Sequence, residues 1–421
     1  MRKTLKWIFL VVAFAPLGLV NGCETTERIL TTAERAVSSK TVKTVVDVVE
    51  SKDPEEVLKR RAEAYTRDPE ALLRDLRTAQ RDFEALMAAL TGNVKRTWGN
   101  KEVKLPERTK YIKYTQNYRS RAIVDFDAGE VTVETLDDKD PAGSLKNAIV
   151  TTLLTPDDPR AVDLFSDKSV ALTGDQEPYL LGLVLDQQGK PVRTPEQAER
   201  FAASLMEKQA GTRTVEVGES RKPAWYVTMK MVPNFEHKQA EKYRPAVTRF
   251  AGQYKVSPSL VFAIIRTESN FNPFAVSSAP AYGLMQLVPT SGGREAYRRA
   301  KGADAIPSRD YLFDAKNNIE LGSAFLNVLT YNQLEEVADS VSREYCVIAA
   351  YNTGSGNVLR TFSKDQTAAI NEINRLHPGA LYDALRARLP YEETRRYLAK
   401  VVNYRKQFVS QPSAAEASPG Q

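Results

Sequence analysis

The chain has 421 residues, and its 59 Lys and Arg against 53 Asp and Glu give a formal net charge of only +6. This length allows two or three domains with cores of their own, and 42% hydrophobic with 27% charged residues is an ordinary globular composition. The modest, dispersed charge does not indicate a nucleic-acid-binding protein. Only two histidines, His237 and His377, are present, which disfavours His-based triads and multi-His metal sites. We therefore expect no metal, no cofactor and no nucleic-acid partner.

The first residues have the pattern of an export signal. A basic start precedes an apolar run over residues 7–20, which is too short for a comfortable membrane span. The sequence Val-Asn-Gly-Cys at 20–23 resembles the lipobox of bacterial lipoproteins, so we expect a signal peptide over 1–22 and a lipid anchor at Cys23. Glu24, in place of Asp, favours the outer membrane, with the protein facing the periplasm. A soluble exported protein with an incidental cysteine is the alternative.

Residues 23–97 are expected to form a tether followed by helices that pack, from about residue 40, on the next domain. The pair Asp68-Pro69 supplies an N-cap and a first helical residue, and Gly92 is expected to end the helix. Apolar residues at helical spacing predict one core-facing stripe. Its members are Leu72, Leu73, Leu76, Phe83, Leu86, Met87 and Leu90.

Between residues 98 and 233 the apolar period changes to two, which predicts an α+β accessory domain. Residues 110–127 and 130–136 alternate around Ala128-Gly129 and predict a β-hairpin, and residues 214–217 and 224–231 predict a second strand pair. A helix near 194–207 should cover the sheet. We interpret the acidic residues of this domain as solvated loop charges. A role in positioning substrate and a purely structural role both remain open.

Residues 234–408 have a helical pattern, with loops expected at 275–281, 302–308 and 353–356. The Ser-, Ala- and Pro-rich residues 409–421 are expected to be a disordered tail. The predicted fold class is α+β: an N-terminal helical plus antiparallel-sheet domain, then an all-α domain. Cys346 lies in an apolar helical segment, which predicts a packed thiol rather than a nucleophile.

Glu268 is the most informative residue of the helical domain. Ser257 and Pro258 predict the start of an apolar helix, and Asn272-Pro273 predicts its end. Glu268 then falls in or near the last turn, where helix carbonyls and apolar surroundings both disfavour the ionised carboxyl. The pKa should rise, as a general acid near neutral pH requires. The alternative is a solvated glutamate closing a core helix.

Four ordered motifs accompany this residue. They are Glu268-Ser269, Gly283-Leu284-Met285-Gln286, Ala350-Tyr351-Asn352 and Glu393-Thr394 with Tyr397. Together they resemble the soluble-lytic-transglycosylase-like domain of the family 23 glycosidase clan, which has a lysozyme-like fold, over residues 233–404. The lipoprotein signal and the segments 98–104 and 347–359 are similar to the membrane-bound lytic transglycosylases in particular, and that likeness covers nearly the whole mature chain.

The resemblance implies roles for the matching residues. Glu268 matches the catalytic acid/base, and Ser277 a serine that hydrogen-bonds the acid or the N-acetyl sugar region. Gln286 matches a substrate-binding glutamine, and Tyr351 a tyrosine near the catalytic carboxyl. Val288 stands where many relatives have methionine. Weaker substrate-binding candidates complete the set: Asn352, Tyr345 and Tyr397.

The expected mechanism uses one carboxylate. No second acid lies between Glu268 and Gln286, and Asp314 is expected to be an N-cap. Glu268 would protonate the oxygen that leaves C1 of N-acetylmuramic acid and would then act as base on the C6 hydroxyl of the same sugar, giving a 1,6-anhydro ring. Two alternatives remain open: a goose-type lysozyme-like hydrolase, and a non-catalytic lipoprotein that binds peptidoglycan strands. The sequence gives no oligomeric state.

Overall fold

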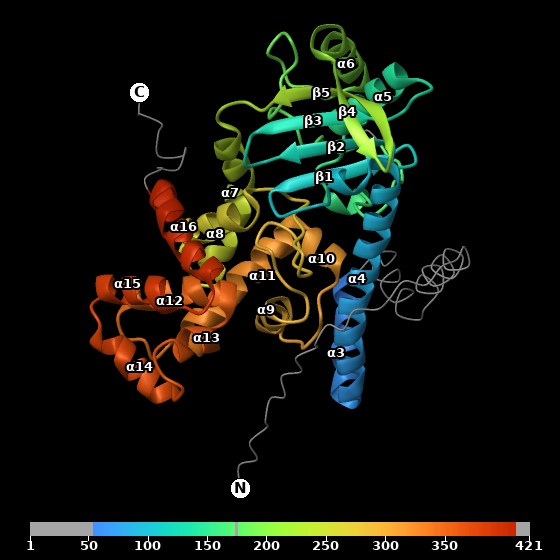
Figure 1. The fold of residues 1–421 in the computed structure, drawn as a ribbon. Helices are drawn as coiled ribbons and strands as arrows, with labels where there is room; N and C mark the ends of the chain where they lie inside the picture. The colour runs from blue at the N-terminus through green and yellow to red at the C-terminus, as the bar shows by residue number, and fades with distance from the viewer. Residues whose placement is uncertain (1–53, 173–175, 410–421) are drawn as a thin grey trace, which may run out of the picture.

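The computed structural model describes residues 54–172 and 176–409, and the expected fold class is confirmed. An N-terminal part with two helices and a five-stranded antiparallel sheet is followed by an all-helical part (Figure 1). The predicted signal peptide, Cys23, the tether up to residue 53 and nearly all of the tail lie outside the described residues. Within the described ranges, no helix has the length and apolar character needed to cross a membrane.

Two helices open the described chain, α3 (Pro54–Arg67) and α4 (Pro69–Trp98). As predicted, Asp68 caps α4, its carboxylate accepting a hydrogen bond from the Glu70 N–H at 3.0 Å. The prediction that Gly92 ends this helix is wrong. The buried side chains of Val94 and Trp98 continue the apolar stripe, and the helix stops only before Gly99, whose φ is 81°.

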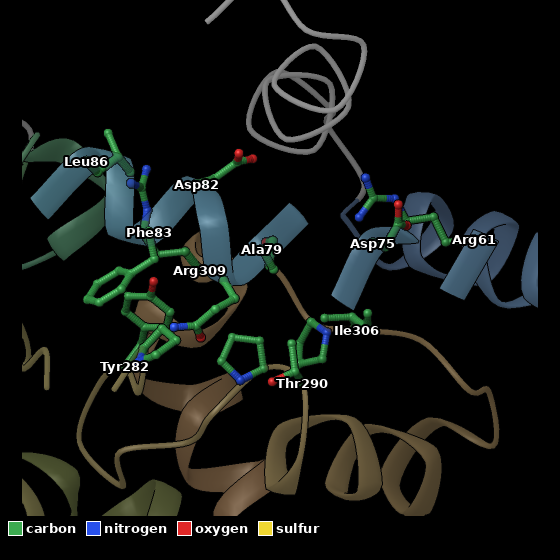
Figure 2. Close-up of a pocket in the computed structure, with 15 residues that line it drawn as sticks. Arg61, Asp75, Ala79, Asp82, Phe83, Leu86, Tyr282, Thr290, Ile306 and Arg309 are labelled. Carbon is green, nitrogen blue, oxygen red and sulfur yellow. The ribbon is translucent and has the colours of Figure 1, made fainter. Parts of the chain in front are cut away.

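The stripe predicted on α4 is only partly buried. Phe83 and Leu90 are in the core, whereas Leu73 and Leu86 are 51% and 40% exposed. The middle of α4 passes the helical part rather than the sheet, and a pocket of about 140 Å³ separates them. Figure 2 shows Phe83 reaching from α4 toward Tyr282, and the two rings meet edge to face at 6.2 Å.

The sheet has the strand order β1-β2-β3-β5-β4 and is antiparallel throughout. The strands are β1 (Lys110–Thr115), β2 (Ser120–Asp125), β3 (Glu130–Thr135), β4 (Gly211–Val217) and β5 (Ser220–Lys230). The predicted hairpin around Ala128-Gly129 is confirmed as β2-β3. The single strand predicted over 110–127 is wrong, because Gln116, Asn117 and Tyr118 adopt positive φ and reverse the chain. Asn117 is a common turn residue, but without a glycine or proline beside it the turn signal is weak, and we did not recognise it.

The second strand pair is confirmed with different limits. The turn is shorter than predicted, and Pro223 lies within β5 instead of in the turn. β3 pairs with β5 only from Trp225 onward. Pro223 lies beyond the end of β3, so its missing N–H costs no hydrogen bond to that strand. Helix α6 (Pro195–Gln209) is the predicted one and has a Thr194–Gln197 capping box. Helix α5 (Pro141–Leu153), which we did not predict, packs beside α6 on the sheet (Figure 1).

The helical part is built around α8, whose apolar side chains are buried between α7, α11 and α16. Cys346 is buried, as predicted, and burial raises the pKa of its thiol to about 12. The helices are α7 (Phe235–Gln253), α8 (Pro258–Ser269), α9 (Gly292–Lys301), α10 (Arg309–Phe313), α11 (Ala315–Val328), α12 (Ser340–Thr353), α13 (Ser355–Arg360), α14 (Gln366–Arg375), α15 (Pro378–Arg388) and α16 (Glu392–Val409), with a π-helical turn, η3, at Leu329–Gln333. Short 3₁₀ turns, η1 and η2, lie at Asn100–Glu102 and Pro159–Ala161.

A buried ion network fixes the edge of the sheet domain. The fully buried Arg121 guanidinium lies 2.7 Å from Glu134 and 2.8 Å from Glu102, and stacks over the Trp98 ring at 3.8 Å. Arg213 binds the same two carboxylates. Hydrogen bonds from Arg213 and Arg121 lower the pKa of Glu102 to about 2. Our interpretation of the acidic residues here as solvated loop charges is therefore wrong for Glu102 and Glu134.

Replacing Arg121 by methionine should lower the free energy of unfolding by about 3 kcal/mol or more, because Glu134 keeps a buried charge with fewer partners. Urea unfolding at neutral pH measures the loss. Lys101→Met is the matched control, since its ion pair with Glu216 is exposed and screened by solvent and should contribute little to stability. Equal losses in the two variants would contradict this account of the network.

Candidate active site

The helix that carries Glu268 begins after Ser257 and places Glu268 in its last turn, as predicted. It ends earlier than the predicted stop at Asn272-Pro273. Asn270 adopts a left-handed conformation with φ 45°, and its side-chain amide donates to the Phe126 carbonyl oxygen at 2.7 Å. Asparagine tolerates this conformation better than most residues do, and the bond directs the chain toward the sheet.

The Glu268 carboxyl is buried, with only 6% of the residue exposed. Burial raises its pKa to about 7, against the lowering effects of the Tyr397 hydroxyl and the Arg108 guanidinium, while the Glu393 charge raises it further. The prediction of a raised pKa is thus confirmed. Near neutral pH, a large fraction of this carboxyl holds a proton that it can donate.

Two charged side chains lie near Glu268: Arg108, which we did not predict, and Glu393, which we predicted only as part of a motif. Nη1 of Arg108, in the loop before β1, lies 3.6 Å from Oε2 of Glu268 and 3.7 Å from Oε1 of Glu393 on α16. We expected a single carboxylate, yet Glu393 is a second one in contact with the same guanidinium. Both residues are remote from Glu268 in sequence. Arg108 has no local signal, and the Glu393-Thr394 motif did not indicate a contact with an arginine.

Gly283 and Asn318 fix the Gly-Leu-Met-Gln turn that faces Glu268. Gly283 has φ 74°, and a Cβ there would lie 2.4 Å from the Leu312 carbonyl oxygen, so no other residue fits without a shift. The fully buried Asn318 amide donates to the carbonyls of Tyr282 and Leu312 at 2.9 and 2.7 Å and accepts from the Met285 N–H at 2.7 Å. Sequence reasoning missed Asn318, because nothing in its own helix indicates what it bonds.

Ser269 joins the two halves of the site. Its hydroxyl donates to the Leu284 carbonyl at 2.8 Å and is also within 3.0 Å of the Ile265 carbonyl. The side chain is fully buried. Its role is therefore to bind the end of α8 to the turn.

The predicted substrate-binding residues have different environments. Gln286 donates from Nε2 to the Ala275 and Gly283 carbonyls at 3.1 and 2.9 Å, while its buried Oε1 has no partner among the described residues. The Tyr351 hydroxyl donates to the Met285 carbonyl at 2.8 Å. Burial and the charge of Glu268 raise the pKa of Tyr351 well above its usual value.

The other predicted residues are less uniformly placed. Asn352 accepts a 2.7 Å hydrogen bond from the Thr394 hydroxyl, and the Ser277 hydroxyl donates to the Ala279 carbonyl. The Tyr397 hydroxyl is buried without a well-aligned hydrogen-bond partner among the described residues, but it lowers the pKa of Glu268. Tyr345 packs against the ring of Tyr382 at 5.2 Å and does not line the cleft.

A long cleft is lined by Glu268, Ser277, Gln286, Tyr351 and Asn352. It consists of two hollows of about 740 and 940 Å³ that share Gln286, Val288, Tyr351 and Asn352. The first also contains Glu268, Ser277 and residues 105–109 of the N-terminal part, and the second runs along α9 toward Gly354. Helix α10 is preceded by Ser308, and Asp314 caps α11 as predicted, its carboxylate accepting from the Asn317 N–H at 2.9 Å.

This arrangement suits acid catalysis on an extended polar chain. A buried carboxyl with a raised pKa lies in a cleft large enough for an extended ligand, beside amide and hydroxyl groups that can bind it. In the described part of the chain, no three His, Cys, Asp or Glu side chains come together as a metal site.

Comparisons with solved structures give partial matches. An inactive mutant of the lytic transglycosylase Slt from Pseudomonas aeruginosa is 28% identical with a TM-score of 0.31, and covers 40% of this chain and 25% of its own. The 70-kDa soluble lytic transglycosylase from Escherichia coli is 26% identical with a TM-score of 0.31, and covers 41% and 26%.

Sequence comparisons identify the family. Residues 67–242 match the family described as membrane-bound lytic murein transglycosylase C, N-terminal domain, and residues 246–374 match the transglycosylase SLT domain. A membrane-bound lytic murein transglycosylase C of Yersinia enterocolitica is 42% identical over 341 residues, 81% of this chain and 92% of the relative. One of Yersinia pestis is 42% identical over 326 residues, 77% and 89%. The chain therefore belongs to the membrane-bound lytic murein transglycosylase C family.

Proposed function

We propose that this chain cleaves the β-1,4 bond between N-acetylmuramic acid and N-acetylglucosamine without water and leaves 1,6-anhydro-N-acetylmuramic ends. Its family makes it a peptidoglycan lytic transglycosylase, a lyase that acts on the cell-wall polymer. The observation that carries the mechanism is the Glu268 carboxyl, buried in the cleft with a pKa of about 7. Such a group is available both as an acid and as a base near neutral pH.

Glu268 acts twice in this mechanism. In the first step the C1–oxygen bond breaks, and the leaving oxygen takes the proton from Glu268. In the second step the resulting carboxylate removes the proton of the C6 hydroxyl, whose oxygen bonds to C1 of the same sugar. The proton returns to Glu268, no water is consumed, and the internal nucleophile supplies the effective concentration.

The residues that line the cleft supply substrate contacts. Oε1 of Gln286, for which the described part of the chain offers no partner, can accept a hydrogen bond from a sugar hydroxyl or an acetamido N–H. The same hollow is lined by Ser277, Tyr351 and Asn352. The Tyr397 hydroxyl acts on Glu268 itself, because it lowers the pKa of that carboxyl. Tyr345, which does not line the cleft, has no place in this scheme.

We also propose a lipid-anchored location for this chain. The Val-Asn-Gly-Cys sequence at 20–23 supports lipidation at Cys23, and Glu24 supports an outer-membrane position facing the periplasm. The relatives' name, membrane-bound, is in accord with a membrane association. An anchor of this kind would keep the cleft beside peptidoglycan strands.

Hydrolysis by the goose-type lysozyme mechanism is the second candidate, and Glu393 is the observation that favours it. Two carboxylates near one another are the usual equipment of enzymes that add water to a glycosidic bond. Glu393 is 68% exposed and pairs with Arg108, whereas Glu268 is buried. If Glu393 activates water, Glu393→Gln will abolish release; in the lytic mechanism this variant still forms anhydro products.

Digestion of purified murein sacculi followed by mass spectrometry tests the reaction. The wild type should release muropeptides with anhydro ends, lighter by one water than hydrolytic products. Glu268→Gln should slow release by about 10²–10⁴-fold, because the proton donor is lost. Glu392→Gln, which removes an exposed carboxylate at the start of α16, is the control and should keep near wild-type activity. Reducing ends from the wild type would sink the lytic assignment.

The raised pKa of Glu268 predicts a pH-dependent stability effect. The folded protein holds this proton more tightly than the unfolded chain, so ionisation costs stability as the pH rises from about 4.5 to about 7. Below this window the cost is absent. Relative to wild type, Glu268→Gln should therefore gain about 3 kcal/mol of unfolding free energy across the window. Urea unfolding on both sides of it gives the comparison, and a pH-independent difference would contradict the burial argument.

A further inference from the structure

The loop after α8 is anchored inside the accessory domain. Phe274 is fully buried, and its ring lies 4.6 Å from that of Tyr111 on β1 and 5.0 Å from that of Tyr179. Such aromatic contacts stabilise beyond their buried area. The segment that follows the catalytic helix is therefore part of the core of the neighbouring domain.

Two buried side-chain amides cross the same boundary. Asn270 donates to the Phe126 carbonyl oxygen at 2.7 Å, and Asn272 donates to the Arg108 carbonyl oxygen at 3.0 Å. Asn272 is fully buried, and its Oδ1 accepts from the Phe274 N–H at 3.0 Å. Separating the domains would leave these groups unpaired, which is costly for buried amides. The backbone of Arg108 is thus fixed relative to the end of α8.

The fixed backbone directs the Arg108 guanidinium to two carboxylates. Its Nη1 lies 3.6 Å from Glu268 and 3.7 Å from Glu393, and the side chain is 40% exposed. Both distances are longer than a close hydrogen-bonded pair, so the guanidinium is shared between the carboxylates rather than committed to one. Its interaction with Glu268 can therefore strengthen when that carboxyl loses its proton.

The other groups that face Glu268 are two tyrosines and one acid. Tyr397 and Glu393 come from α16, and Tyr351 comes from α12. The basic residues Arg266 and Lys400, and the acidic residues Glu107 and Asp127, lie further along the wall of the same hollow.

Arg266 is engaged elsewhere, since it pairs with Glu236, bonds to Gln407 and stacks on the Tyr404 ring at 4.2 Å. Within the described ranges, Arg108 is the cation that forms an ion pair with Glu268.

We propose that Arg108, supplied by the accessory domain, is a positioning residue that holds the Glu268 carboxylate between its two proton transfers. The inference rests on the proposed function, in which one carboxyl serves as acid and then as base. Without a nearby cation, the buried Glu268 carboxylate would take up a proton again too readily to persist. With a tightly bound cation, its pKa would fall and Glu268 would be a poor acid. Because Arg108 is shared with Glu393, its interaction with Glu268 is of intermediate strength. The accessory domain is accordingly part of the catalytic cleft.

The test compares Arg108→Gln, Arg108→Lys and Glu393→Gln with the wild type. Initial rates of anhydro-muropeptide release at low sacculus concentration, measured against pH, follow kcat/KM, and the basic limb reports the ionisation of Glu268 in the free enzyme. Arg108→Gln should move this limb to higher pH by about one unit, because the charge that favours the carboxylate is gone. Arg108→Lys should stay near the wild-type profile. Glu393→Gln should move the limb to lower pH, because it removes the opposing charge.

Three results would overturn the proposal. One is a basic limb in Arg108→Gln that coincides with the wild type; another is an equal shift in Arg108→Gln and Arg108→Lys, which would indicate packing rather than charge. The third is a Glu393→Gln limb that moves upward or not at all. Thermal unfolding shows whether each variant is folded, and if Arg108→Gln is not, the Glu393→Gln shift decides. The identity of the products is scored separately, so hydrolytic ends would refute the proposed function without being mistaken for failure of the Arg108 inference.

Discussion

The turn from Asn270 to Phe274 is the constraint on which the active site depends. Two consecutive left-handed residues, Asn270 and Phe271, end α8 abruptly. Hydrogen bonds from the buried side-chain amides of Asn270 and Asn272 then direct the chain toward the sheet instead of into solvent. Because the turn lies against β1 and β2, the last helical residues are covered as well. Glu268 is buried beside this junction, and burial raises its pKa to about 7.

The opposite wall of the site is held in place by residues that do not face the cleft. Asn318, on α11, holds the backbone of the Gly-Leu-Met-Gln turn, and Ser269 binds that turn to the catalytic helix. Gly322 on the same helix leaves the space that the Met285 side chain occupies, since a Cβ there would lie 2.1 Å from the sulfur. Orientation of Gln286 thus depends on close packing beneath it, as preorganised sites generally require.

Local chemistry explains what the sequence could predict. Asp68-Pro69, Ser257-Pro258 and Asp314 mark helix starts through bonds or dihedral angles within a few residues, and each marks a start in the structure. The predictions that failed depended on distant partners. Gly92 does not end α4, because packing of Val94 and Trp98 outweighs the low helix propensity of one glycine.

The same reason explains the missing parts of the site. Arg108 and Glu393 approach Glu268 only through the tertiary fold. Glu393 was named as part of a motif, but a single sequence carries no signal for its contact with Arg108. The motif residues were accessible because their pattern resembles a known family, not because their geometry could be derived.

The hydrogen bond between Asn272 and Arg108 joins residues 164 positions apart. Contacts of such long sequence separation require a large loop to close, which costs chain entropy. Arg108 and Glu268 meet only when the two parts of the chain that carry them are both folded and docked against each other. Catalytic activity in this enzyme is therefore also a measure of how completely those two parts are docked.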